Sequence, residues 1–240
     1  MASSSTEVHQ DQPVGHIVRS NPETAAVFDR YGIDYCCNGS RSLLVAATRE
    51  SVSLETLTEE LENASVDDND PVEWDSLTEL IDHIESSHHA YLRNELPPLL
   101  QLVTKVRIVH ASSHPALADV YRTAVELADG MIRHIREEET VVFPIIRHLE
   151  QGEPIPDAEL SRLREEISNM EQDHEETGDA LARLAALTDG YRVPDGACTS
   201  YESMLARLER LQQDTYQHVH TENNILFRDA EALLQKIDCD

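Results

Sequence analysis

Two stretches of the chain share a pattern that decides the fold. Residues 134–143 read HIREEETVVF and residues 218–227 read HVHTENNILF, and both place a His four residues before a Glu. On an α-helix, residues four apart point the same way and lie one turn apart. Each stretch therefore predicts a helix that presents one nitrogen and one oxygen donor to a common point. The donors are His134 with Glu138 and His218 with Glu222.

Outward from these pairs, the chain from residue 73 onward contains four long stretches with helical periodicity. They cover residues 73–111, 115–150, 157–188 and 198–237, and short segments rich in Ser, Gly or Pro separate them. Because such short connections force neighbouring helices to run antiparallel, the sequence predicts an all-α, up-down-up-down four-helix bundle. A Pro97-Pro98 pair lies inside the first stretch, and we expect a kink or a one-turn break there.

Each predicted helix carries an apolar stripe that polar residues interrupt near its middle. The third helix contributes His174, and the first contributes His88 or His89. Counting back from Leu92 favours His89, whereas counting forward from Ile84 favours His88. A further His110 lies about 30 Å along the first helix at 1.5 Å per residue and is excluded. Beyond the two Glu residues, the stripes are expected to continue through Val141, Ile145 and Leu149, and through Ile225 and Leu233.

Together, the polar residues that interrupt the four apolar stripes are four His and two Glu. A single His on an apolar stripe is most often a satisfied core residue, but a coincidence on all four helices favours a metal site. Imidazole and carboxylate donors without thiolate suit iron or manganese, and six ligands are too many for one catalytic zinc. Two metals bridged by Glu138 and Glu222, each with two His, use the whole set.

Charge excludes several classes of partner. The chain has 46 acidic and 19 basic residues, for a net charge of −27. Such a polyanion is a poor candidate for binding duplex nucleic acid or an anionic membrane. Apolar runs are too short to span a bilayer, and we recognise no secretory leader. Excess acid with only two lysines is typical of proteins from a high-salt cytoplasm, although an ordinary acidic protein is the alternative.

The remainder of the chain predicts a small helical domain before the bundle. Residues 1–12 read as a disordered tail, 13–64 as a compact helical domain, 65–72 as an acidic linker and 73–240 as the bundle. In the small domain, Asn21 and Ser53 are expected to cap helices. Its Cys36 and Cys37 are adjacent, which argues against a disulfide framework and for a reducing, cytoplasmic location.

The adjacent cysteines are a second candidate site. Two thiols at a turn could hold iron transiently, bind a nitrosyl or exchange a disulfide with a partner. The alternative is that one is buried, one is exposed and both only pack. Cys198 and Cys239 lack a partner motif and are interpreted as incidental.

Several motifs together resemble the iron–sulfur cluster repair di-iron proteins, also called "repair of iron centres". They are HHAYLRNELP at 88–97, KVRIVH at 105–110, HIREEETVVFP at 134–144, MEQDHEETG at 170–178 and HVHTENNILF at 218–227, preceded by DYCCNG at 34–39. The resemblance implies a hemerythrin-like bundle behind that family's small Cys-Cys domain. It also implies a ligand set in which His89 is chosen over His88: His89, His134, Glu138, His174, His218 and Glu222.

The resemblance further implies a function. Similar proteins hold two non-haem irons, bridged by an oxo group and the two Glu, and help to restore iron–sulfur clusters damaged by nitric oxide or peroxide, by supplying iron. The expected partners are damaged iron–sulfur proteins and a cellular reductant, and a cysteine domain on a linker would suit a homodimer. The alternatives are a hemerythrin-like carrier or sensor of oxygen or nitric oxide, an enzyme that reduces nitric oxide, and a scaffold without metal.

Overall fold

The computed structural model describes residues 8–64, 74–152 and 154–238. These residues form helices and connecting turns, and the only extended pairing among them is an isolated bridge between Pro13 and Ser42. The predicted all-α class is therefore confirmed. The chain divides into two compact units, one of Met1–Asp75 with Val219–Asp229 and one of Ser76–His218 with Ala230–Asp240. The domain boundaries expected from the sequence remain predictions.

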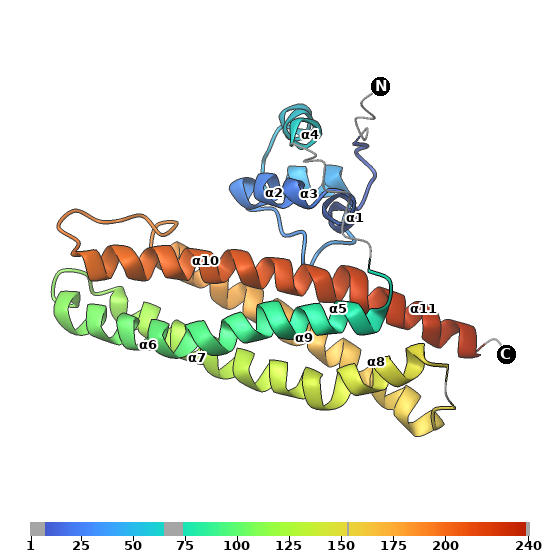
Figure 1. The fold of residues 1–240 in the computed structure, drawn as a ribbon. Helices are drawn as coiled ribbons and strands as arrows, with labels where there is room; N and C mark the ends of the chain where they lie inside the picture. Colours follow the sequence, from blue (N-terminus) through green and yellow to red (C-terminus); the bar gives the residue numbers. More distant parts are fainter. Residues whose placement is uncertain (1–7, 65–73, 153, 239–240) are drawn as a thin grey trace. The chain divides into compact units, whose positions relative to one another are not determined.

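Beyond residue 76 the chain forms a bundle of long helical rods (Figure 1), and Val219–Asp229 of the last rod are grouped with the smaller unit. There are four rods among the described residues. The first, second and fourth each contain a short π-helical segment between two α-helices, whereas the third is one uninterrupted α-helix. The rods are α5 (Leu77–Ile84), η2 (Glu85–His89) and α6 (Ala90–His110); α7 (Leu117–Glu137), η3 (Glu138–Val142) and α8 (Phe143–Glu150); α9 (Asp157–Leu187); and α10 (Thr199–Thr221), η4 (Glu222–Leu226) and α11 (Phe227–Asp238).

The bundle is held by an apolar core that all four rods supply. Burying these side chains contributes roughly 1.5–3 kcal/mol each relative to exposure. Members that are 5% exposed or less include Leu92, Leu99 and Val103 of α6, Val120, Leu127 and Met131 of α7, Leu181 and Leu184 of α9, and Met204 and Leu208 of α10.

The predicted break at the two prolines does not occur, because α6 continues through Pro97 and Pro98. A proline cannot donate to the carbonyl four residues earlier, so two helical hydrogen bonds are lost. Both prolines are exposed, so water can reach that side of the helix, while Leu96 and Leu99 stay buried in the core. Packing therefore keeps the rod intact where local propensity predicts an interruption.

The apolar stripe slips by one residue in the fourth rod but not in the second. Beyond η3 the structure buries Ile145 and Leu149 as expected; only Val141, inside η3, is half-buried, and Val142 is buried instead. At the end of η4 and beyond it, the structure buries Leu226 and Leu234. The expected Ile225 and Leu233 are only half-buried. A π turn contains one more residue than an α turn, so positions counted with an α-helical period fall one residue short.

The smaller unit packs short helices around one core. They are α1 (Val14–Ser20), the 3₁₀ turn η1 (Pro22–Thr24), α2 (Ala25–Tyr31), α3 (Leu43–Arg49) and α4 (Leu54–Asn63). Ser53 caps α4 as predicted, because its Oγ accepts a hydrogen bond from the backbone of Thr56. Asn21 does not cap with its side chain; its backbone carbonyl accepts from Thr24 instead.

The predicted tail and linker fall partly or wholly outside the described residues. Residues 1–7 and the acidic linker at 65–72 lie outside them. Residues 8–12 are described, and their backbone is engaged: the carbonyls of Gln10 and Gln12 accept hydrogen bonds from Leu44 and Leu43 at the start of α3. These contacts fix the chain just before α1, where the sequence alone predicts disorder.

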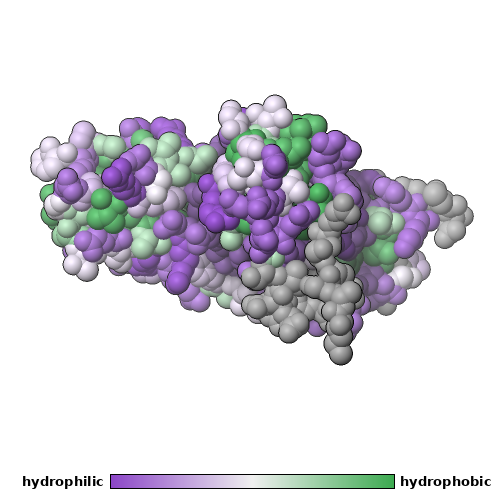
Figure 2. All heavy atoms as spheres, turned by 90° about the horizontal axis from the view of Figure 1, so that it is seen from above, coloured by the Kyte–Doolittle hydropathy of each residue, from purple (hydrophilic) through white to green (hydrophobic). Residues whose placement is uncertain are grey.

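The surface is dominated by hydrophilic residues in the view of Figure 2. That appearance agrees with the net charge of −27. No helix in the described part of the chain combines the length and the apolar character needed to cross a membrane.

Candidate metal centre

The structure brings together all six metal-site residues predicted from the sequence. Each is at most 4% exposed, and charged or polar groups are buried this deeply only when they share partners. His89 ends η2, His134 lies in α7, His174 lies in α9 and His218 lies in α10, while Glu138 and Glu222 are the first residues of η3 and η4.

Their donor atoms form two groups, within each of which the atoms lie within 4.8 Å of one another. The first group contains His89 and His218, the second contains His134 and His174, and Glu138 and Glu222 belong to both. This is the arrangement expected of two cations that share a pair of carboxylates. It matches the two-His-per-metal division that the sequence predicts.

The shortest distances show how the carboxylate of Glu138 lies between the two groups. Its Oε2 is 3.4 Å from Nε2 of His89, and its Oε1 is 3.2 Å from Nε2 of His134. Within the groups, Nε2 of His89 is 3.1 Å from Nε2 of His218, and Nε2 of His134 is 2.9 Å from Nε2 of His174. The four imidazoles therefore direct the same ring nitrogen toward the centre.

The π segment η2 explains why the sequence leaves His88 and His89 undecided. A π turn spans five residues where an α turn spans four, so counting forward from Ile84 across η2 leads to His89. His88 points elsewhere: its Nδ1 lies 3.2 Å from Asp214, and its ring stacks on His218 at 5.2 Å between centroids. His88 therefore packs behind a member of the site instead of joining it.

Carboxylates behind two of the imidazoles set their tautomers. Nδ1 of His89 donates to Glu139 at 2.8 Å, and Glu139 in turn accepts from Arg93 at 2.6 Å. Partial burial alone would raise the pKa of Glu139, but the hydrogen bonds from Arg93 and His89 hold it below its usual value. An ionised Glu139 keeps the His89 proton on Nδ1 and leaves the Nε2 lone pair facing the centre.

His134 has a weaker arrangement of the same kind. Its Nδ1 lies 3.4 Å from Asp173, whose side chain is 46% exposed. The hydrogen bond from His134 lowers the pKa of Asp173, with burial opposing it. Sequence reasoning missed Glu139 and Asp173, although each is directly adjacent to a predicted ligand.

The donor chemistry fits a pair of metal cations. Two imidazole nitrogens 2.9 Å apart repel through their lone pairs unless a proton or a cation lies between them. Two buried carboxylates add negative charge that a cation would balance. Nitrogen and oxygen donors without thiolate are the set that suits iron and manganese.

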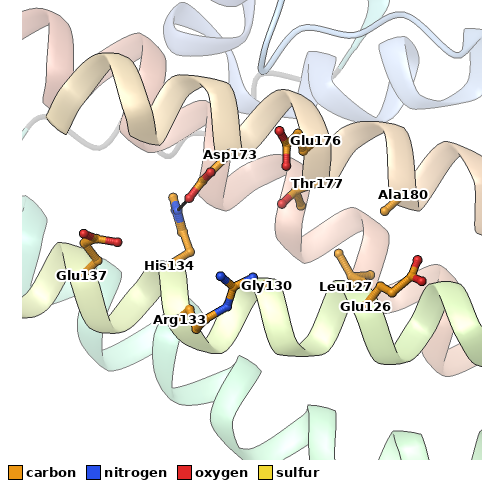
Figure 3. Close-up of a pocket in the computed structure, with 10 residues that line it drawn as sticks. All are labelled: Glu126, Leu127, Gly130, Arg133, His134, Glu137, Asp173, Glu176, Thr177 and Ala180. Atoms are coloured by element: carbon orange, nitrogen blue, oxygen red, sulfur yellow. Dashed lines mark hydrogen bonds and ion pairs between the residues drawn. The ribbon is translucent and has the colours of Figure 1, made fainter. Parts of the chain in front are cut away.

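A cavity of about 390 Å³ lies beside the second group, between α7 and α9 (Figure 3). Buried His134 lines it together with Asp173, and the two side chains point toward one another. Other lining residues are exposed, so the cavity reaches the surface. Its charged lining is mainly acidic: Glu126, Glu137, Asp173 and Glu176, with Arg133 opposing them.

The adjacent cysteines form a separate cluster in the smaller unit. The Sγ atoms of Cys36 and Cys37 are 3.7 Å apart, and Asp34 accepts hydrogen bonds from both backbone amides. Cys36 is buried and Cys37 half-buried. The Cys37 thiol and burial together raise the pKa of Cys36 well above its usual value. The donor atoms of Asp34, Cys36 and Cys37 lie within 4.8 Å of one another.

Asn224 anchors the cysteine turn within the same unit. Its side-chain amide donates to the backbone carbonyl of Cys36 at 3.0 Å and lies 3.2 Å from Nδ1 of His220. Burial lowers the pKa of His220 to about 4, so this imidazole is neutral and accepts the amide hydrogen. No periodic signal in the sequence marks Asn224.

Cys198 has a different neighbour from the adjacent pair. Sγ of exposed Cys198 is 3.2 Å from Nε2 of His110, and these two residues belong to neither donor group of the metal centre. Cys239 lies outside the described residues.

Comparisons with known proteins agree with this geometry. A family model called ScdA_N, a domain of unknown function (DUF542), matches residues 10–65, and the hemerythrin HHE cation binding domain matches residues 80–230. The iron-sulfur cluster repair protein ScdA of Staphylococcus haemolyticus is 35% identical over 89% of this chain and 95% of its own length. The iron-sulfur cluster repair protein YtfE of Escherichia coli O157:H7 is 34% identical over 93% of this chain and 98% of its own. With one domain match spanning more than half of the chain and relatives spanning nearly all of it, the chain belongs to the ScdA and YtfE family, in which an ScdA_N domain precedes a hemerythrin HHE domain.

Proposed function

We propose that this chain is a di-iron protein that repairs iron–sulfur clusters damaged by oxidative or nitrosative stress by donating iron. The observation that carries the proposal is the pair of buried donor groups that share Glu138 and Glu222. The relatives in Staphylococcus haemolyticus and Escherichia coli are iron-sulfur cluster repair proteins, which supports the same function. The expected partners are damaged iron–sulfur proteins and a cellular reductant, in a reducing cytoplasm.

The six donors would hold the irons, one between His89 and His218 and one between His134 and His174. When bound, iron supplies a one-electron change of oxidation state that alters its affinity for these ligands. Glu139 and Asp173 hold protons on Nδ1 of their imidazoles and so keep Nε2 available as a donor. The six side chains are at most 4% exposed, so the donors are largely shielded from bulk water.

The cysteine turn is proposed to act in transfer. The thiols of Cys36 and Cys37, with the Asp34 carboxylate, could take a soft cation for a short time or exchange a disulfide with a partner. A homodimer, in which one copy's cysteine turn serves another copy, is compatible with a separate small unit. Exposure of Cys37 is what allows contact with a partner.

The test is to load the purified protein with ferrous iron, let air oxidise it, and count iron per chain before and after dithionite in the presence of a ferrous chelator. We expect about two irons per chain, their release on reduction, and recovery of activity when a peroxide-damaged iron–sulfur enzyme replaces the chelator. His174→Ala should lose iron, whereas His148→Ala, an exposed His on α8, should not.

Three outcomes contradict the proposal. Two irons retained through reduction, with a reversible oxygen adduct, indicate an oxygen carrier. Turnover of nitric oxide to nitrous oxide at the loaded centre, without iron release, indicates a reductase. If the chain binds no iron, the six residues have a structural role only.

A further inference from the structure

The two donor groups have unequal surroundings. This inference rests on the proposed function, because it concerns which of the two irons is donated. His89 and His218 lie in a closed environment: the His89 ring stacks on buried Phe143 at 5.7 Å, and the His218 ring stacks on His88. Of the other pair, His134 lines the 390 Å³ cavity between α7 and α9, and its ring lies against that of His174 at 4.6 Å between centroids.

The carboxylates that contact the two imidazoles, Glu139 behind His89 and Asp173 behind His134, are also held with unequal firmness. Glu139 contacts His89 at 2.8 Å and is itself held by Arg93 at 2.6 Å, with a side chain only 23% exposed. The hydrogen bond between Asp173 and His134 is longer, at 3.4 Å, and the Asp173 side chain is twice as exposed, at 46%. Since a carboxylate behind a ligating imidazole raises its basicity, the firmer partner gives the stronger ligand.

The cavity reaches His134 on the side of the more exposed carboxylate, Asp173. Four carboxylates line it and Arg133 opposes them, so its field attracts positive ions. Figure 3 shows the side chains of Asp173 and His134 meeting in the space between the two helices. Gly130 also lines the cavity, and a Cβ added there would meet no atom within 4 Å.

We propose that the metal held by His134 and His174 is the one that leaves, through the cavity, while the metal held by His89 and His218 is retained by the Glu139–Arg93 pair. Release would need one electron per ferric ion from the reductant. His134, His174 and the shared carboxylates would hold the ion that leaves, would keep their electron pairs when it departs as ferrous iron, and would be replaced around it by water.

The test follows iron release to a ferrous chelator after dithionite. Wild type should release one iron quickly and one slowly. Asp173→Asn should accelerate the fast phase by about 10- to 100-fold, the usual effect of losing such a carboxylate, and Glu139→Gln should accelerate only the slow phase. Glu175→Gln removes an exposed charge next to His174 outside the cavity and should change neither phase.

Two further measurements distinguish an effect on the exit route of the iron from an effect on the affinity of the site for iron. Gly130→Leu adds a side chain at the cavity wall, where a Cβ meets no atom within 4 Å, and should slow the fast phase while iron content at equilibrium stays unchanged; Gly130→Ala is its matched control. A crystal frozen after the fast phase should show anomalous scattering from iron at His89 and His218 only.

The outcomes distinguish this inference from the proposed function. Two irons that leave in one phase, or a remaining iron at His134 and His174, would overturn the inference while leaving iron donation intact. A wild type that loads no iron overturns both. An unchanged fast phase in both Asp173→Asn and Gly130→Leu excludes the cavity side as the exit.

Discussion

A carboxyl group enclosed in the smaller unit makes the stability of that unit depend on pH. Burial raises the pKa of Asp29 to about 6, and a hydrogen bond with Tyr35 offsets part of this shift. The native state therefore binds more protons than the unfolded chain between about pH 4 and 6. Stability should fall as pH rises through that window and stay level above it.

Asp29→Asn removes this penalty. At pH 7.5 we expect the free energy of unfolding of the variant to exceed that of the wild type by about 1 kcal/mol, after allowance for partial solvent exposure. At pH 4 the two proteins should be equally stable. Urea denaturation at both pH values measures the difference. Asp11→Asn, at an exposed site, is the control. Equal stabilisation at both pH values would show that ionisation of Asp29 is not the cause.

Gly39 is the residue that lets the cysteine turn approach Asn224. A Cβ at this position would lie 2.7 Å from the carbonyl oxygen of Tyr35 and against the Asn224 side chain. Backbone cannot move aside cheaply, so Gly39→Ala should destabilise the unit by about 1–3 kcal/mol. It should also expose the buried Cys36 thiol, which a thiol reagent measures as faster labelling. Gly130→Ala, where a Cβ has free space, should show neither effect; slow labelling in Gly39→Ala would contradict the anchoring role.

At the scale of elements, the π segments place the site. η2 ends on His89, and η3 and η4 begin on Glu138 and Glu222. Each π turn contains one residue more than an α turn, and after η4 the apolar stripe resumes one residue later than an α-helical count predicts. The sequence carries one trace of this: counts from the two sides of His88 and His89 disagree by one residue.

The start of α5 is capped from another element. The Glu150 carboxylate at the end of α8 accepts hydrogen bonds from the backbone amides of Leu77 and Thr78 at 2.5 and 2.9 Å. Burial alone would raise the pKa of Glu150, but the hydrogen bonds of Thr78 and Leu77 lower it. The stabilisation is therefore complete above the unfolded pKa, near 4.3, and is lost as pH falls below it.

Glu150→Ala should cost about 1 kcal/mol at neutral pH, the usual value of a helix cap. Glu165→Ala, at an exposed position of α9, is the control. Thermal unfolding followed by circular dichroism at pH 7 and pH 3 checks the prediction. A variant that differs from wild type as much at pH 3 as at pH 7 would contradict a role for the ionised carboxylate.

At the scale of the molecule, the net charge of −27 works against the compact state. Raising the salt concentration from 0.1 to 1 M shortens the screening length from about 10 to 3 Å. The midpoint of thermal unfolding should therefore rise by several degrees, roughly 1–2 kcal/mol of stability. A variant with exposed Glu165 and Glu175 changed to Lys should show a smaller rise. A midpoint independent of salt in wild type would contradict the prediction.

The sequence by itself determined the helices, the bundle and five of the six residues that meet, because the apolar period and the spacing of His134 and Glu138 are local properties of a helix. The same period left His88 and His89 undecided. The tertiary structure decided the rest: α6 continues through Pro97 because its neighbours are buried in the core, and the π segment η4 shifts the register beyond Glu222. The supporting contacts of Glu139, Asp173 and Asn224 join residues distant along the chain. No local period encodes such contacts, because they exist only once separate helices have packed at one level.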